Sequence, residues 1–178
     1  MDIGPAFLAQ SREYLTGHYL PKILAAVAPL SDADLWWRPN DHSNSVGNLL
    51  LHLTGNITQW IVGGVGQQPG ERDRAAEFAR REPIPRADLL GRFAEAVSAA
   101  DAVLAGTLPA TLQEPRTVQG RQVTVLSAVY HAVEHFSMHT GQILYLAKLR
   151  TGAGLEFYRV EDGIARAAWP GHPQSGSA

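Results

Sequence analysis

The chain has 178 residues, 45% of them hydrophobic, which suits one globular domain with a buried core. Its formal net charge of −2 leaves no electrostatic footprint for nucleic acid, and no apolar run is long enough to span a bilayer. The absence of cysteine excludes disulfides, cysteine-ligated metals and a catalytic thiol of the protein's own. The first residues lack the basic and apolar regions of a secretory signal, so we expect a cytoplasmic protein without nucleic-acid or membrane partners.

Apolar residues recur at helical spacing over residues 3–28, which predicts a first long helix. Pro21 interrupts this pattern, and its ring would clash with the carbonyl of Gly17, so we expect a kink or a short break there. A second long helix is predicted from about Ser45, with Asn44 or Ser45 as N-cap, to Gly63–Gly64. Two more are predicted, from Pro85 to Gly106 and over about 125–150.

The connections between these helices carry weaker signals. Residues 66–85 are polar and of mixed charge, and we expect a surface connection with about one helical turn that covers the mouth of a pocket. Residues 114–125 have β-branched residues on both sides of a Gln-Gly pair, which indicates a small hairpin. Because strand signals are otherwise almost absent, we predict an all-α four-helix bundle over residues 1–155 and a partly disordered C-terminal extension over 156–178.

Three histidines in the last predicted helix carry the strongest chemical signal. His135 and His139 are four residues apart, so their imidazoles lie about 40° apart around the helix and about 6 Å apart along it, where one metal ion can bind both. His52 stands on the otherwise apolar inner face of the second helix and is the best candidate for a third ligand. His131 lies too far along the helix to share the same ion, which favours a place in the pocket wall.

Three nitrogen ligands leave coordination positions open and suit zinc or nickel first, with iron or manganese as alternatives. A metal-free cluster of hydrogen-bonded histidines remains a second interpretation of the same pattern. Gln142 or Asn56 would orient a ligand imidazole, and Trp60 would lie in the core or in the pocket wall.

Two stretches, VEHFSMHTGQI (133–143) and NSVGNLLLHLTGN (44–56), resemble motifs of the DinB-like superfamily. The resemblance extends over about residues 10–150, and the stretches LWWRP, NITQWIVGG and ERDRAAEF fit one branch of that superfamily. It implies a four-helix bundle with a long crossover connection, often paired as a homodimer. It also implies a divalent metal ion held by three histidines, here His52, His135 and His139.

Relatives of known activity in that superfamily include thiol-dependent S-transferases, such as mycothiol-dependent maleylpyruvate isomerase and the bacillithiol transferases. The present chain departs from their common His-His-Arg motif, because it has Met138, His139 and Thr140 there. An arginine that would hold an anionic substrate is therefore missing. Arg72 and Arg74 are possible replacements; otherwise they are solvated charges paired with neighbouring acids.

The resemblance favours a metal-dependent transferase, in which the ion lowers the pKa of a low-molecular-weight thiol for attack on a small electrophile. The alternatives are a hydrolase of a small ester or amide, with His131 or Glu134 as the nearby bases, and a non-enzymatic metal-binding stress protein. The sequence assigns no catalytic residue.

Overall fold

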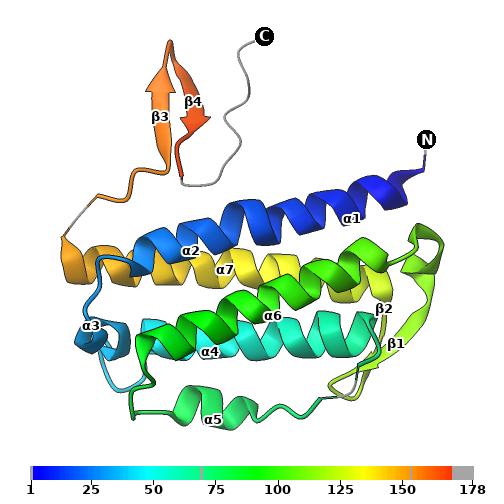
Figure 1. The fold of residues 1–178 in the computed structure, drawn as a ribbon, viewed down its shortest axis with the longest axis horizontal. Coiled ribbons are helices and arrows are strands. Elements are labelled where there is room, and N and C mark those ends of the chain that lie inside the picture. Colours follow the sequence, from blue (N-terminus) through cyan, green and yellow to red (C-terminus); the bar gives the residue numbers. More distant parts are fainter. Residues whose placement is uncertain (1, 69, 153, 170–178) are drawn as a thin grey trace.

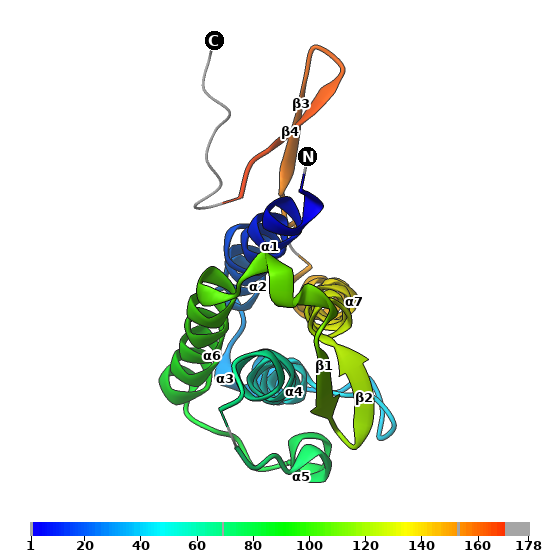
Figure 2. The ribbon, with the colours of Figure 1, turned by 90° about the vertical axis from the view of Figure 1, so that its right-hand side faces the viewer.

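The computed structural model describes residues 2–68, 70–152 and 154–169. Most of them are helical, which confirms the all-α expectation, and within these ranges no helix has the length and hydropathy needed to cross a membrane. Four long helical segments lie side by side (Figures 1 and 2). They are α1–η1–α2 (Ile3–Glu13, Tyr14–Tyr19, Leu20–Val27), α4–η2 (Val46–Ile57, Thr58–Val65), α6 (Arg86–Gly106) and α7 (Val125–Thr151). Short helices α3 (Asp32–Trp36), α5 (Arg74–Ala79) and η3 (Pro109–Gln113) lie in the connections.

The first helical segment passes through Pro21 without ending. The expected interruption takes the form of a π-helical stretch, η1, immediately before α2, in which the Leu20 N–H bonds to the Leu15 carbonyl. Because proline has no N–H, the Gly17 carbonyl lacks its usual partner four residues ahead. The indole Nε1 of Trp169 donates to that carbonyl at 2.8 Å, so a residue near the end of the described chain satisfies it.

The second helical segment begins at the N-cap Ser45, one of the two residues predicted for that role. The Ser45 hydroxyl accepts from the Asn48 N–H, and the Asn48 side chain reaches back to the Ser45 N–H, which completes a capping box. The Asn48 amide also donates to the carbonyls of Glu77 and Arg80, at 2.8 and 3.1 Å. Asn48 therefore joins the start of α4 to the end of α5.

The predicted hairpin is present as antiparallel strands β1 (Pro115–Val118) and β2 (Arg121–Thr124). Its turn residues Gln119 and Gly120 both have positive φ angles, of 52° and 73°. Helix α7 follows directly and ends at Gly152, which adopts the left-handed conformation of a C-cap. The core between the helices is apolar, and the rings of Phe93 on α6 and Phe136 on α7 stack within it.

A second hairpin, β3 (Tyr158–Glu161) and β4 (Ile164–Ala167), was not predicted from the sequence. It projects from the helices near α2 (Figure 1). Lys22 of α2 reaches this region, with its Nζ 3.8 Å from the centre of the Trp169 ring and 5.1 Å from that of Tyr158. The disorder predicted at the C-terminal tip falls on residues 170–178, which lie outside the described residues.

Candidate metal centre

Three histidines from two helices converge on one point between α4 and α7. The Nε2 atoms of His52 and His135 lie 2.8 Å apart, and the ring centres of His135 and His139 lie 4.4 Å apart. One nitrogen from each of the three rings falls within 4.8 Å of the others. The structure thus brings together the three residues that sequence analysis chose as ligands, at a spacing within the reach of one ion after small rotations of the rings.

His139 has one ring nitrogen without a hydrogen-bond partner in the described residues. Its Nδ1 lies 2.7 Å from the Gln142 side-chain oxygen, so Nδ1 carries the proton and donates to that oxygen. The Nε2 of the same ring therefore has a free lone pair. Within the described ranges this Nε2 is buried and has no hydrogen-bond partner. A buried acceptor without a donor is costly, and a cation at the cluster would satisfy it.

His52 is oriented by an acidic residue from α5. Its Nδ1 lies 2.9 Å from the Glu77 Oε2 and 3.1 Å from a terminal nitrogen of Arg72. An ionised carboxylate only accepts hydrogen bonds, so the Nδ1 proton is directed at Glu77. The Arg72 nitrogen has other acceptors, namely Glu77 Oε2 at 2.8 Å and the His52 carbonyl. With its proton on Nδ1, His52 also turns a free Nε2 lone pair toward the cluster.

The cover over His52 is an ion pair from the connection between α4 and α6. Arg72 Nε lies 2.6 Å from Glu77 Oε1, and the two side chains are 6% and 10% exposed. This finding corrects the interpretation of Arg72 as a solvated charge paired with a sequence neighbour. Arg74 lies over the ring of Phe78, which in turn packs against the His52 ring. The connection therefore covers His52, and its expected place over a pocket mouth remains a prediction.

Gly55 on α4 makes room for this cover. A Cβ atom at Gly55 would overlap the Glu77 carboxylate and would lie 2.7 Å from Arg72 Nε. Only a residue without a side chain allows the ion pair to lie this close to the helix. The glycine thus explains why α5 can bring its carboxylate down to His52.

The electrostatics of the cluster favour neutral imidazoles. Burial, followed by the neighbouring histidines and Arg72, lowers the pKa of His135 to about 3. Burial also lowers the pKa values of His131 and His139. For Glu77, burial would raise the pKa, but hydrogen bonds from Arg72 and His52 outweigh it and lower the pKa. At neutral pH His135 and His139 therefore offer uncharged nitrogen donors beside an ionised carboxylate.

A comparison with protein-family models gives one match, to the model of the DinB superfamily, over residues 20–143. The matched range is more than half of the chain and contains all three converging histidines. The chain belongs to the DinB superfamily. Among curated proteins, the comparison finds no match to this chain.

In this DinB-superfamily protein, His131 lies one helical turn before His135 and contacts Asn56 and Trp60 of the second helical segment. Asn56 Nδ2 lies 3.4 Å from His131 Nε2, and the Trp60 ring lies 4.0 Å from the His131 ring. Asn56 Oδ1 and Trp60 Nε1 are buried without a hydrogen-bond partner in the described part of the chain. Asn56 thus contacts His131 and none of the three proposed ligands, and the contribution of both residues to a pocket wall remains a prediction.

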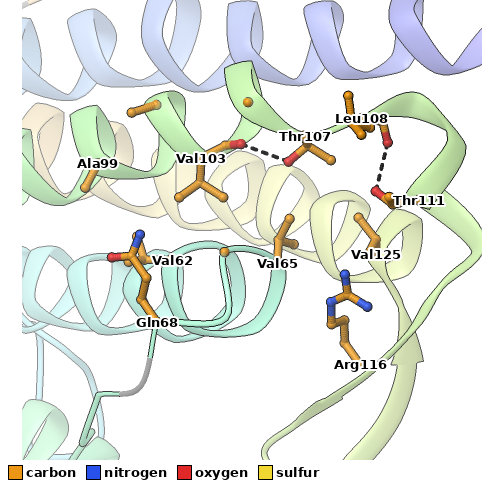
Figure 3. Close-up of a pocket in the computed structure, with 13 residues that line it drawn as sticks. Val62, Val65, Gln68, Ala99, Val103, Thr107, Leu108, Thr111, Arg116 and Val125 are labelled. Atoms are coloured by element: carbon orange, nitrogen blue, oxygen red, sulfur yellow. Dashed lines mark hydrogen bonds between the residues drawn. The ribbon is translucent and has the colours of Figure 1, made fainter.

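Two cavities of this DinB-superfamily protein lie away from the converging nitrogens. One, of about 620 Å³, lies between η2, α6 and the start of α7, and its walls include Val65, Val103 and Arg116 (Figure 3). The other, of about 600 Å³, borders Gly55, Arg72 and Glu77 and so reaches the cover of the histidines. The second cavity is large enough for a small molecule, but Arg72 and Glu77 line it and none of the three histidines does.

Glu77 was not among the site residues predicted from the sequence. The glutamate belongs to the ERDRAAEF stretch, which was quoted only for its family resemblance. It lies in a six-residue helix within a polar connection, where charged residues are ordinarily solvated. The one sequence signal that could have indicated it is Gly55, a glycine inside an otherwise well-formed helix.

Proposed function

We propose that this protein binds one divalent metal ion through His52, His135 and His139. We further propose that it uses the ion to transfer a low-molecular-weight thiol to a small electrophile. The observation that carries the proposal is the buried, unpartnered Nε2 of His139, on a ring that has one nitrogen within 4.8 Å of a nitrogen of His52 and of His135. Zinc or nickel suits three imidazole donors best, with iron and manganese as alternatives.

A bound divalent ion would supply a positive charge that lowers the pKa of a thiol, so that the reactive thiolate forms at neutral pH. The chain's own residues prepare the site for it. Glu77 and Gln142 hold the protons of His52 and His139 on Nδ1, which leaves their Nε2 atoms free to bind. His135 and His131 are half-buried, so their rings are partly open to solvent.

Transfer is preferred over hydrolysis because neither Glu77 nor Glu134 is placed to act as a base. Glu77, the carboxylate in contact with the cluster, is occupied by Arg72 and His52, and Glu134 is exposed on the outer face of α7. For the hydrolase alternative, His131 is the remaining candidate to take a proton from water. A metal-binding stress protein without catalysis is the non-enzymatic alternative.

The test has two parts and uses the full-length protein purified without a histidine tag. Elemental analysis should find about one equivalent of metal per chain, and chelation should remove it. The metal-loaded protein should then accelerate conjugation of thiol cosubstrates to a panel of electrophiles above the metal-free protein. If metal is bound but only ester or amide substrates react, the hydrolase alternative replaces the transferase; if neither reacts, the binding protein remains.

We also propose that the chain forms a four-helix bundle of the DinB type over residues 1–155, with an extension over 156–178, and that two copies pair through α7. Four large apolar side chains are exposed on this helix: Tyr130, Met138, Tyr145 and Leu149. Glu134 and Lys148 stand seven residues on either side of Gly141, so an antiparallel α7 pair would oppose their charges. Light scattering should give a dimer mass that Tyr145→Glu halves.

A further inference from the structure

The segment that covers the candidate centre has a role that neither the family nor the three ligands define. We propose that Glu77, held by Arg72, is a positioning residue that keeps His52 in the Nδ1–H tautomer. We propose in addition that docking of α5 on α4 thereby sets the affinity of the site for its cation. The inference rests on the proposed metal-binding function.

The contacts form a chain from the surface connection to the ligand. Arg72 donates from two nitrogens to both oxygens of Glu77, at 2.6 and 2.8 Å, and this bidentate geometry holds the carboxylate plane in one orientation. The Oε2 atom then faces His52 Nδ1 at 2.9 Å. Arg72 is fixed in turn by Gln59, whose side-chain oxygen lies 3.0 Å from it. Each link orients the next, and the last one is the imidazole.

The tautomer matters because a neutral imidazole has one donor and one acceptor nitrogen. With the proton on Nε2, His52 would turn an N–H toward the cation and could not ligate it through that atom. An ionised carboxylate at Nδ1 favours the other tautomer and also makes the ring a better donor to a metal. Arg72 balances the charge of Glu77, so the carboxylate can remain ionised although it is 10% exposed.

Coupling of this kind is reciprocal. If docking of α5 raises the affinity for the cation, then the cation must stabilise the docked position of α5 by the same free energy. Amide hydrogen exchange of residues 70–80 should therefore slow when metal is added. Substitution of Gly55 perturbs this coupling by steric means alone. A methyl group there would displace Glu77 and Arg72 without altering any polar group of the site.

The experiment compares Glu77→Ala, Gly55→Ala and a matched control, Gly91→Ala. Gly91 lies on α6, and a Cβ at that position would meet open space. Affinity for zinc is measured by competition with a chromophoric chelator. Loss of an outer hydrogen-bond partner of a ligand typically weakens metal binding about 10–100-fold. We expect losses in this range for Glu77→Ala and Gly55→Ala and less than a twofold change for the control. Unchanged affinity in Glu77→Ala would overturn the proposal.

A second readout does not depend on metal. Nitrogen-15 NMR of the histidine rings in the metal-free protein distinguishes the two tautomers of His52. We expect the Nδ1–H form in the wild type and a mixture, or the Nε2–H form, in Glu77→Ala. An Nε2–H tautomer in the wild type would refute the positioning role. If the wild type binds no metal at all, the proposed function fails, and this tautomer measurement alone decides whether Glu77 positions His52.

Discussion

His52 on α4 and His135 on α7 come from segments 83 residues apart in the chain, and their Nε2 atoms lie 2.8 Å apart. Since His52 Nε2 is an acceptor, this contact needs either a proton on His135 Nε2 or a cation shared by both rings. The same pair of atoms would therefore form a hydrogen bond in the metal-free protein and, under the proposed function, a pair of ligands in the loaded one.

Removal of one ligand should abolish stoichiometric metal binding. We expect His52→Ala and His139→Ala to weaken metal affinity by more than the roughly 10–100-fold typical of an outer-shell change. His42→Ala, in an exposed loop, is the matched control and should retain full metal content. Elemental analysis after gel filtration checks the prediction. Equal metal content in all four proteins would place the ion elsewhere.

The metal-free protein should lose stability as the pH falls from 6.5 to 5. The pKa values of His131, His135 and His139 are lowered in the folded state, so below about pH 6.5 the unfolded chain binds more protons than the folded one. The contribution of these neutral histidines to the free energy of unfolding is therefore fully present above pH 6.5 and declines on acidification. His135 alone contributes a slope of up to about 1.4 kcal/mol per pH unit.

Urea unfolding in the presence of a chelator, at several values between pH 7.5 and 5, measures this slope. The carboxylates stay largely ionised in that window and add little. His135→Gln should flatten the profile, because the substituted side chain does not titrate. A wild-type profile that is already flat would contradict the lowered pKa values.

Trp169→Phe should destabilise the protein by about 1 kcal/mol, because the Gly17 carbonyl would lose its hydrogen-bond donor. The loss should shrink when Pro21 is replaced by alanine, since residue 21 then offers an N–H to that carbonyl. A double-mutant cycle in urea measures this difference. Equal losses in the two backgrounds would show that the indole acts through ring packing alone.

Asn48→Ala should lower the free energy of unfolding by about 2 kcal/mol or more. The change removes the capping box of α4, leaves the Glu77 carbonyl without its side-chain donor and takes one of several donors from the Arg80 carbonyl. Asn44→Ala, at the neighbouring position that was considered as N-cap, should have a much smaller effect. Thermal unfolding of the two variants beside the wild type checks the difference, and similar losses would contradict it.

The long helices and the proximity of His135 to His139 could be predicted from sequence because both depend on local spacing. A 3–4 residue repeat marks the helices, and the step from His135 to His139 is itself a helical turn. Pairing of these two with His52 required the additional inference that His52 faces inward, for which its apolar neighbours were sufficient evidence.

The Arg72–Glu77 cover could not be predicted in the same way, because the burial of Arg72 depends on tertiary docking at Gly55. The β3–β4 hairpin was also missed, although the sequence does contain a turn signal for it. Asp162 and Gly163 at its turn have positive φ angles of 53° and 78°, and Asp-Gly is a strong hairpin signal. Its strands have only four residues each, too short for alternation to stand out.

The candidate centre has two walls of different origin. The histidines stand on α4 and α7, whose packing is part of the core, whereas the opposite wall belongs to a surface connection. Surface connections tolerate insertion and replacement far better than core helices do. Residues 66–85 can therefore change during evolution while the helices that carry the histidines are kept. New selectivity at this centre can arise in this way without disturbing the folding of the helices.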